Sequence, residues 1–333
     1  MCVEGCSSGT GWKQRPWCLW GCFVGRADVY LQPGAADPVL SPATVLALAR
    51  RHVSAAAAVT GVDESGGEAR AYLVDDDVVV KTQRPHRLRP RTSLAKEAYL
   101  LDMLETGLGA RVPRLFGYDK VDTPEGVVEY LCMSRMRGLP ARAAEISDAA
   151  RPVLLTGLGR LLRTLHATRA DDGVVPRDTD AAALARRLEF GFGDLADALS
   201  QRRNAWTAPV PADEVARRAL AALPDTLAGP PVVLHSNPSP THVFVDPDTG
   251  QLIGLIDFGD AYASHPALDL HRWPSPADRV MIRDGYLDGG PVGGDFDRMW
   301  TIAMIVTDLA VIAAGSPYAP QATVDLTGRL DDL

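Results

Sequence analysis

The sequence lacks the features that would place it among nucleic-acid-binding or membrane proteins. Its 333 residues include 42 acidic and 34 basic ones, for a net charge of −8, whereas nucleic-acid binding depends on Lys and Arg side chains that neutralise phosphates. The longest apolar run, Met299–Ala314, is interrupted by Asp308 and is shorter than the roughly 18 to 20 residues that a membrane span needs. We therefore expect neither nucleic acid nor membrane as a partner, and we expect this run to form a buried helix.

Cysteine is nearly absent from the body of the chain, where Cys132 stands alone. The other four lie within the first two dozen residues: Cys2, Cys6, Cys18 and Cys22. Two equally spaced pairs allow a zinc site, but the segment shows no helix or strand pattern, and we expect residues 1–25 to be a disordered tail or an extension from an upstream start codon. The apolar patch Trp17–Val24 is broken by Gly21 and does not fit a secretory signal, which favours a cytoplasmic protein.

The length allows one large domain or two lobes around a shared cleft. In residues 26–137, stretches with the two-residue period of strands alternate with helical stretches. Ser41 and Pro42 supply the capping hydroxyl and the first-turn proline of a helix. Strands are predicted over residues 57–63, 69–75, 78–81, 112–120 and 127–136, and helices over residues 41–52 and 93–105. This part is expected to be an antiparallel sheet with helices.

After Gly138 and Pro140 the pattern becomes mainly helical. Helices are predicted around residues 154–165, 180–200, 211–223, 276–287 and 295–314, and short strands at residues 232–234, 243–245 and 252–256. The sequence thus predicts an α+β, bilobal fold with an N-lobe over residues 26–137 and a C-lobe over residues 138–333. The cleft between two such lobes is a common place for a ligand.

The segment Ile256-Asp257-Phe258-Gly259 carries the clearest chemical signal. It puts a carboxylate at the end of an apolar strand, where Asp257 can hold a Mg²⁺ ion that bridges the phosphates of a nucleotide. The same triplet also occurs as an ordinary strand-to-turn sequence. A second segment bracketed by strands lies about twenty residues upstream, His235-Ser236-Asn237-Pro238-Ser239-Pro240-Thr241-His242.

The upstream segment resembles the kinase catalytic loop, H-x-D-x-x-x-x-N, with His235 at the His, Asn237 at the Asp and His242 at the Asn. Nearer the N-terminus, Lys81 ends a Val-rich strand, and Glu97 lies in the following helix, where the two can form an ion pair. Each residue alone could be a solvated strand or helix position. Their order and spacing together indicate a site for phosphoryl transfer from a nucleotide.

On these residues the chain resembles the aminoglycoside phosphotransferase family, a branch of the protein-kinase-like fold, from about residue 40 to about residue 315. The run Leu161–Ala167 is similar to a helix of that family's C-lobe, and Glu129–Gly138 is similar to its hinge strand. The resemblance implies that the N-lobe binds the nucleotide and that the C-lobe carries the catalytic loop and binds the substrate. The implied cofactors are Mg²⁺ and ATP or GTP as phosphoryl donor.

The resemblance also assigns roles to individual residues. The backbone near Ser134 and Met136 is expected to bind the adenine. Lys81 is expected to bind the α- and β-phosphates, with Glu97 as its ion-pair partner. The stretch Ser65–Glu68 stands where the family has its nucleotide-covering loop, although it has no G-x-G-x-x-G pattern. In the segment after the metal site, Asp269 is expected to buttress the catalytic loop.

Two positions depart from the family pattern. His242 replaces the metal-binding Asn, as in macrolide phosphotransferases, and is expected to keep a metal or phosphate role beside Asp257. Asn237 replaces the general base, and an amide cannot accept a proton as a carboxylate does. Since general base catalysis is typically worth about 10²- to 10⁴-fold, a slow kinase is allowed, in which Asn237 orients the acceptor hydroxyl and Asp260 or a group of the substrate takes the proton.

Three functions remain open from the sequence. The first is an ATP- or GTP-dependent O-phosphotransferase that acts on a hydroxyl of a small molecule, such as an antibiotic or an amine-bearing metabolite. The second, motivated by Asn237, is a catalytically weak or inactive, pseudokinase-like protein that binds a ligand without transfer. The third is a metabolic kinase of choline-, homoserine- or sugar-like substrates. A monomer and a homodimer are equally compatible with the sequence.

Overall fold

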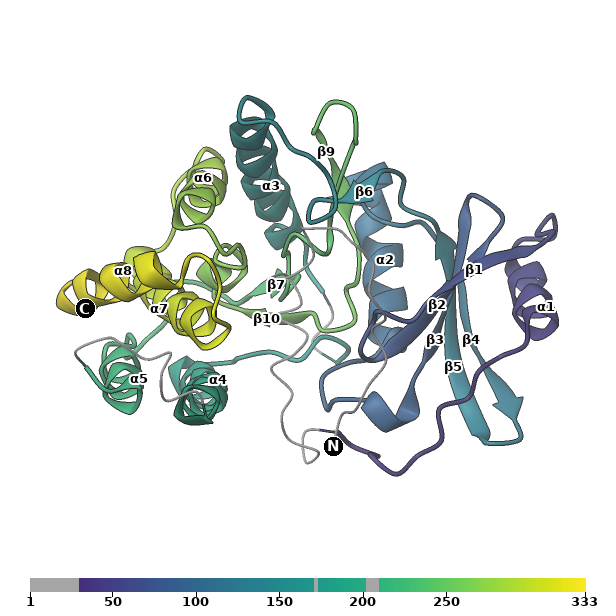
Figure 1. The fold of residues 1–333 in the computed structure, drawn as a ribbon, viewed down its shortest axis with the longest axis horizontal. Coiled ribbons are helices and arrows are strands. Elements are labelled where there is room, and N and C mark those ends of the chain that lie inside the picture. The colour runs from purple at the N-terminus through teal and green to yellow at the C-terminus, as the bar shows by residue number, and fades with distance from the viewer. Residues whose placement is uncertain (1–29, 171–172, 202–209) are drawn as a thin grey trace, which may run out of the picture.

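The computed structural model describes residues 30–170, 173–201 and 210–333. A five-stranded sheet lies on one side of the molecule and a group of helices on the other (Figure 1). This arrangement confirms the predicted α+β fold with an antiparallel sheet in its N-terminal part. The predicted tail of residues 1–25, with its four cysteines, lies outside the described residues. The division into lobes between residues 137 and 138 stays a prediction.

The sheet is antiparallel throughout and has the strand order β1-β2-β3-β5-β4. Its strands are β1 (Val59–Asp63), β2 (Ala69–Val74), β3 (Val78–Gln83), β4 (Leu115–Thr123) and β5 (Gly126–Ser134). Each coincides with a predicted strand apart from a few residues at the ends. The Val-rich β3 is the central strand, which suits the β-branched side chains that pack well on a pleated surface.

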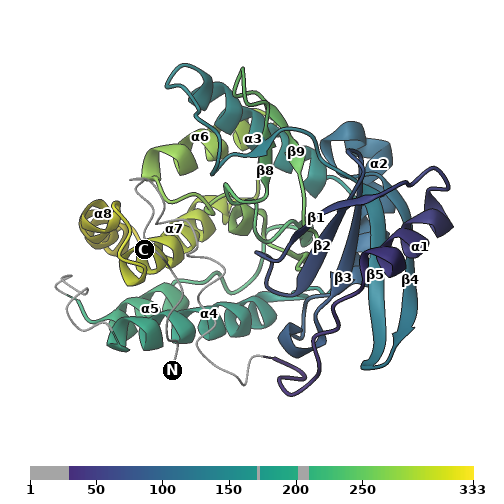
Figure 2. The same cartoon turned by 45° about the vertical axis from the view of Figure 1, so that its right-hand side comes forward.

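Helices α1 and α2 cover opposite faces of this sheet, and the other helices lie beyond α2 (Figure 1, Figure 2). The helices are α1 (Pro42–His52), α2 (Leu94–Leu108), α3 (Ala150–His166), α4 (Ala181–Gln201), α5 (Ala212–Ala221), α6 (Pro276–Leu287), α7 (Phe296–Ala313) and α8 (Ala319–Asp331). The predicted N-cap is confirmed, because Oγ of Ser41 accepts a hydrogen bond from the backbone N–H of Thr44 at 3.1 Å. Ser93 caps α2 in the same way.

Strand β3 shows how the two-residue period sends side chains to opposite faces of the sheet. Val78 and Val80 pack into the core cluster under α1, whereas Val79 packs into the larger core that includes α2. Lys81 follows Val79 by two positions and therefore points to the α2 face. The alternation thus directs this lysine toward the helix that carries Glu97.

Helix α7 is the apolar run that was predicted to be a buried helix, and nearly all of its side chains are buried. The one charge near its middle, Asp308, is also buried and accepts hydrogen bonds from Arg279 at 2.9 Å and from Arg329 at 2.7 Å. Two guanidinium partners compensate a carboxylate that could not otherwise be buried. Among the residues that the structure describes, no helix is long and apolar enough to cross a membrane.

Helix α8 was not predicted. Its buried residues are Ala322, Leu326 and Leu330, spaced four positions apart on one stripe that packs on α7. This stripe was the signal for the helix, but only three apolar residues carry it.

Short strands connect the sheet with the helices and lie between them (Figure 1). They are β6 (Leu139–Pro140), β7 (Val232–Leu234), β8 (Val243–Val245), β9 (Leu252–Leu255) and β10 (Tyr262–Ser264). Strand β7 pairs with β10, and β8 pairs with both β6 and β9. The sequence predicted β7, β8 and β9 but not β6 or β10, because Leu139-Pro140 and Tyr262-Ala263-Ser264 lack the β-branched residues that mark the other three.

Helices α3 and α6 approach each other as closely as glycine allows. A Cβ atom on Gly159 would lie 2.0 Å from the carbonyl oxygen of Ile282, and one on Gly285 would lie 2.2 Å from that of Thr156. Backbone therefore meets backbone at this contact, which leaves no space for a methyl group. A Cβ on Gly157, two residues before Gly159 in α3, would have its nearest neighbour at an ordinary 3.8 Å.

The substitution Gly159→Ala is expected to destabilise the protein by about 1 to 3 kcal/mol, because it forces the two helices apart. Gly157→Ala is the matched control and is expected to stabilise it by about 0.5 to 1 kcal/mol through helix propensity alone. Urea unfolding followed by circular dichroism measures both. Equal free energies of unfolding for the two variants would show that the α3–α6 contact is looser than described.

Candidate active site

The hairpin of β8 and β9 brings together the two predicted metal ligands. Val243 pairs with Leu255 in this hairpin, so the residue before β8 and the residues after β9 meet at its end. There, Nε2 of His242 lies 3.3 Å from Oδ2 of Asp257. The N–H of Ile256 donates to the carbonyl oxygen of His242 at 3.1 Å, which extends the pairing up to the site.

Lys81 of β3 joins the neighbouring helix α2 to the end of the β8–β9 hairpin, which is distant in the sequence. Its Nζ donates to Oε2 of Glu97 at 2.7 Å and to Oδ1 of Asp257 at 2.6 Å. The Glu97 side chain is 1% exposed and the Lys81 side chain 13%, whereas Asp257 remains 43% exposed. The ion pair of Lys81 and Glu97 is therefore buried, whereas the carboxylate of Asp257 is accessible to a ligand.

Electrostatics keeps this group ionised. Burial opposes the charge of Lys81, but the carboxylates of Asp257 and Glu97 outweigh it and hold the pKa of Lys81 above its usual range. Burial likewise opposes the charge of Asp257, and the ammonium group of Lys81 is the largest effect that outweighs it and holds the pKa of Asp257 well below its usual range. Lys81 and Asp257 are thus charged at neutral pH.

The contacts of His242 suit a cation at the end of the hairpin. Its Nδ1 lies 2.8 Å from the carbonyl oxygen of Asn237 and must donate to it, since a carbonyl oxygen only accepts. In the neutral ring Nε2 is then an acceptor, and it faces a carboxylate oxygen of Asp257, which is also an acceptor. Two acceptor atoms that face each other repel, and a cation bound between them would remove this repulsion.

The donor set is small for a metal ion held by protein alone. In the described parts of the chain, no three His, Cys, Asp or Glu side chains are arranged to bind one. Mg²⁺ usually binds to one or two carboxylates together with substrate phosphates and water. Asp257, with His242 beside it, fits an ion that arrives with a nucleotide.

Asp269 holds the backbone of the predicted catalytic loop. Its carboxylate accepts hydrogen bonds from the N–H groups of His235 at 2.6 Å and Ser236 at 2.8 Å, and it lies 3.1 Å from Nε2 of His166. The expectation that Asp269 buttresses this loop is therefore confirmed. The indole N–H of Trp273 adds a bond to the carbonyl oxygen of Pro238 at 3.0 Å.

His235 supports the loop as a neutral side chain. It is fully buried, and burial lowers its pKa to about 4. Its Nε2 donates to the carbonyl oxygen of Ile256 at 2.9 Å, and its Nδ1 accepts from the N–H of Asn237 at 3.3 Å. His235 thus links the loop to the strand end that carries Asp257, and a catalytic role for His235 stays a prediction.

Asn237 offers an unsatisfied acceptor. Its backbone is fixed by His235 and His242, while its side-chain oxygen Oδ1 is buried and accepts no hydrogen bond from the described residues. A buried oxygen without a donor costs free energy unless a ligand supplies one. The hydroxyl of an acceptor molecule is such a donor.

Two residues of the site have a left-handed backbone that is unusual outside glycine, Ser236 with φ of 77° and Asp257 with φ of 72°. Each such residue costs on the order of 1 to 3 kcal/mol and persists only where the surroundings enforce it. Here the carboxylate of Asp269 binds the backbone N–H of Ser236, and the ammonium group of Lys81 binds the side chain of Asp257.

The structure places Asp260 away from the hydrogen bonds of the catalytic loop. Its carboxylate accepts from Nη2 of Arg89 at 2.7 Å and from the hydroxyl of Thr92 at 2.5 Å. Arg89 also contacts Glu68, with 2.5 Å between Nε and Oε1. A role for Asp260 as proton acceptor stays a prediction, and both its oxygens are already engaged.

Sequence reasoning missed Arg89, which joins Asp260 to Glu68 of the predicted nucleotide-covering stretch. A signal existed, because the stretch of residues 84–91 holds four arginines and one histidine in an acidic protein. Which of these side chains contacts Asp260 could not be read from the sequence.

At the predicted hinge, the structure distinguishes the two predicted adenine-binding residues. The N–H of Ser134 donates to the carbonyl oxygen of Arg114 at 2.8 Å, so the sheet already uses it. Met136 has no hydrogen-bond partner among the described residues. Met136 therefore keeps its backbone groups available, and adenine binding there stays a prediction.

Several solved structures with a similar fold are phosphotransferases. The apoenzyme of macrolide 2'-phosphotransferase MphH from Brachybacterium faecium is 20% identical, with a TM-score of 0.50, covering 85% of this chain and 97% of its own. The GDP and kanamycin complex of APH(2")-IIia is 17% identical, with a TM-score of 0.55 and coverage of 87% and 97%. Spectinomycin phosphotransferase APH(9)-Ia, in complex with ADP and spectinomycin, is 14% identical, with a TM-score of 0.55 and coverage of 89% and 95%.

At these identities the structures establish the fold alone. The sequence profile of the phosphotransferase enzyme family (APH) matches residues 61–298, which is well over half of the chain and includes Lys81, Glu97, Asn237, His242 and Asp257. The chain therefore belongs to the phosphotransferase enzyme family.

Proposed function

We propose that this protein is an O-phosphotransferase that moves the γ-phosphoryl group of ATP or GTP to a hydroxyl of a small molecule. The observation that carries the proposal is the position of Lys81 between Glu97 and Asp257, which are 16 and 176 residues away in the sequence. A buried lysine poised beside an exposed carboxylate is what a site for nucleotide phosphates requires. The acceptor class is drawn from the relatives, which include complexes with kanamycin and spectinomycin, and is an antibiotic or an amine-bearing metabolite.

Each residue then has a chemical role. Lys81 would pair with the α- and β-phosphates, and Glu97 keeps it in place. Asp257 and His242 would hold Mg²⁺, which when bound neutralises charge on the phosphates. Met136 would bind the adenine through its backbone. Oδ1 of Asn237 would accept a hydrogen bond from the acceptor hydroxyl and orient its oxygen toward the phosphorus.

Asn237 favours a second candidate, a protein that binds nucleotide or ligand without transferring a phosphoryl group. An amide orients a hydroxyl but cannot take its proton. Phosphoryl transfer depends mainly on positioning and electrostatic stabilisation, so losing the base is expected to slow transfer by about 10²- to 10⁴-fold rather than abolish it. We therefore place a slow enzyme ahead of an inactive binder.

Nucleotide binding tests the site directly. With ATP or GTP and Mg²⁺ at about 100 times the dissociation constant, the native state should gain about 2.7 kcal/mol of stability, seen as a rise in melting temperature. Asp257→Ala is expected to remove the Mg²⁺-dependent part of the rise. Asp248→Ala, an exposed carboxylate in the turn of the same hairpin, is the control and should respond like the wild type. If no nucleotide shifts the wild type, the proposal is wrong.

Restoring the carboxylate tests the role of Asn237. Asn237→Asp is expected to raise kcat for phosphoryl transfer by about 10²-fold or more, because it supplies the missing base. Asn237→Ala should lower kcat below the wild type, because the orienting oxygen is lost. Transfer is measured with radiolabelled ATP over aminoglycosides, macrolides and amino alcohols. Nucleotide binding with no transfer by either the wild type or Asn237→Asp would favour the binding protein.

A further inference from the structure

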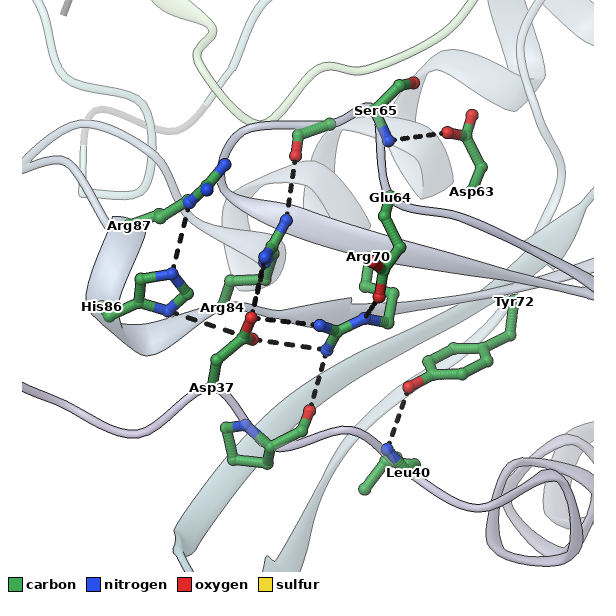
Figure 3. Close-up of polar contacts among 12 residues, drawn as sticks. Asp37, Leu40, Asp63, Glu64, Ser65, Arg70, Tyr72, Arg84, His86 and Arg87 are labelled. Atoms are coloured by element: carbon green, nitrogen blue, oxygen red, sulfur yellow. Dashed lines mark hydrogen bonds and ion pairs between the residues drawn. The ribbon is translucent and has the colours of Figure 1, made fainter. Parts of the chain in front are cut away.

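A segment outside the family match is fastened to the sheet next to the candidate site. Residues 31–40, here called the N-terminal strap, precede α1, whereas the family match begins at residue 61. At one end of the strap the N–H of Leu31 donates to the carbonyl oxygen of Leu88 at 2.8 Å. At its other end the N–H of Leu40 donates to the hydroxyl of Tyr72 at 2.9 Å (Figure 3).

Between these ends, Asp37 binds two arginines of the sheet. Nη2 and Nη1 of Arg70 lie 3.0 and 3.3 Å from its two carboxylate oxygens, and Nη2 and Nε of Arg84 lie 2.7 and 3.2 Å from Oδ2 (Figure 3). Burial opposes the charge of Asp37, but the hydrogen bonds from Arg84 and Arg70 outweigh it and lower its pKa. Asp37 is therefore an anion that offsets the repulsion between two cations.

The same two arginines hold the loop between β1 and β2, residues 64–68. Nε of Arg70 donates to Oε1 of Glu64 at 2.6 Å, and Nη1 of Arg84 donates to the carbonyl oxygen of Gly66 at 3.4 Å (Figure 3). The backbone N–H of Arg84 donates to the carbonyl oxygen of Glu68 at 2.8 Å. The beginning, middle and end of this loop are thus attached to the partners of Asp37.

The end of the loop reaches the candidate active site. Glu68 is bridged by Arg89 to Asp260, which lies three residues after Asp257. Burial raises the pKa of Glu68, Arg89 opposes this, and the nearby carboxylates of Asp260 and Asp257 raise it further. The loop that Asp37 supports therefore ends beside the carboxylate proposed to hold the metal ion.

Without Asp37 the attachment would weaken in two ways. Among the residues that the structure describes, Arg70, whose side chain is 2% exposed, would retain as carboxylate partner only Glu64, which is 56% exposed. Arg84 would lose its charged partner and the forked geometry that aims Nη1 at the loop. A loop that samples several shapes binds a ligand more weakly, because the apparent affinity falls with the fraction of molecules in the competent shape.

We propose that Asp37 is a positioning residue for the nucleotide: through Arg70 and Arg84 it holds residues 64–68 in the shape that covers the phosphates. This inference rests on the proposed function for the identity of the ligand. It assigns a role in the active site to a segment that lies before the family match.

Two measurements on the full chain test the inference. Hydrogen–deuterium exchange without ligand reports the mobility of the amides of residues 64–68, and titration calorimetry with Mg²⁺ and ATP or GTP reports affinity. Asp37→Asn keeps the shape of the side chain and removes its charge, and Asp37→Glu keeps the charge. Asp119→Asn is the matched control, because Asp119 forms an exposed ion pair with Arg51 at 3.7 Å elsewhere on the sheet.

Asp37→Asn is expected to speed exchange in residues 64–68 while α2 and the C-terminal helices stay protected, and to weaken nucleotide binding about tenfold, equivalent to about 1.4 kcal/mol. Asp37→Glu should recover most of the affinity, and Asp119→Asn should match the wild type. If Asp37→Asn does not fold, Arg84→Lys replaces it, because it keeps a charge but loses the fork.

Exchange and affinity equal to the wild type would overturn the inference, and so would faster exchange over the whole molecule, which indicates a merely structural role. If the wild type binds no nucleotide, the proposed function fails separately. The exchange data alone then decide whether Asp37 holds the loop, with local acceleration supporting it and no acceleration overturning it.

Discussion

The candidate site depends on one buried cation. Lys81 is placed by the alternation of β3, Glu97 by the buried stripe of α2, and Asp257 by the end of the β8–β9 hairpin. A buried charge is tolerated only with partners in good geometry, so the sheet, the helix and the hairpin must hold their mutual positions for this lysine to stay ionised. Of these three side chains, Asp257 alone is substantially exposed. A polyanionic ligand can therefore approach Lys81 from the side of Asp257.

Asp269 is a second buried charge. It holds the backbone of the predicted catalytic loop without contacting the side chain of residue 237. The carboxylate accepts from the backbone N–H groups of His235 and Ser236 and contacts His166, and none of these contacts involves the side chain of residue 237. The backbone of this loop is therefore held in place whichever side chain residue 237 carries.

Arginines organise the other side of the site, although the protein as a whole is acidic. Arg70, Arg84 and Arg89 each bridge groups from separate segments, so that the strap, the loop of residues 64–68 and the segment after Asp257 form one connected set. The planar guanidinium group, with several donors, suits such bridging better than an ammonium group does. The net charge of the protein thus said little about the charges around the candidate site.

The sequence by itself determined the fold class, the strands of the sheet, most helices and the order of Lys81, Glu97, His235, Asn237, His242 and Asp257. Strand and helix periods, caps and motif spacing are local properties, and they leave their mark on neighbouring residues. The tertiary structure alone decided that Asp260 binds Arg89 rather than the catalytic loop, and that the N–H of Ser134 already donates to a carbonyl oxygen next to β4. It also decided that Asp37 is connected through two arginines to the loop of residues 64–68. It also decided β6 and β10, which are short and have no β-branched residue, and α8, in which only three apolar residues form the buried stripe. These features arise from contacts between residues far apart in the chain, and no local pattern encodes which of several similar arginines or carboxylates will meet.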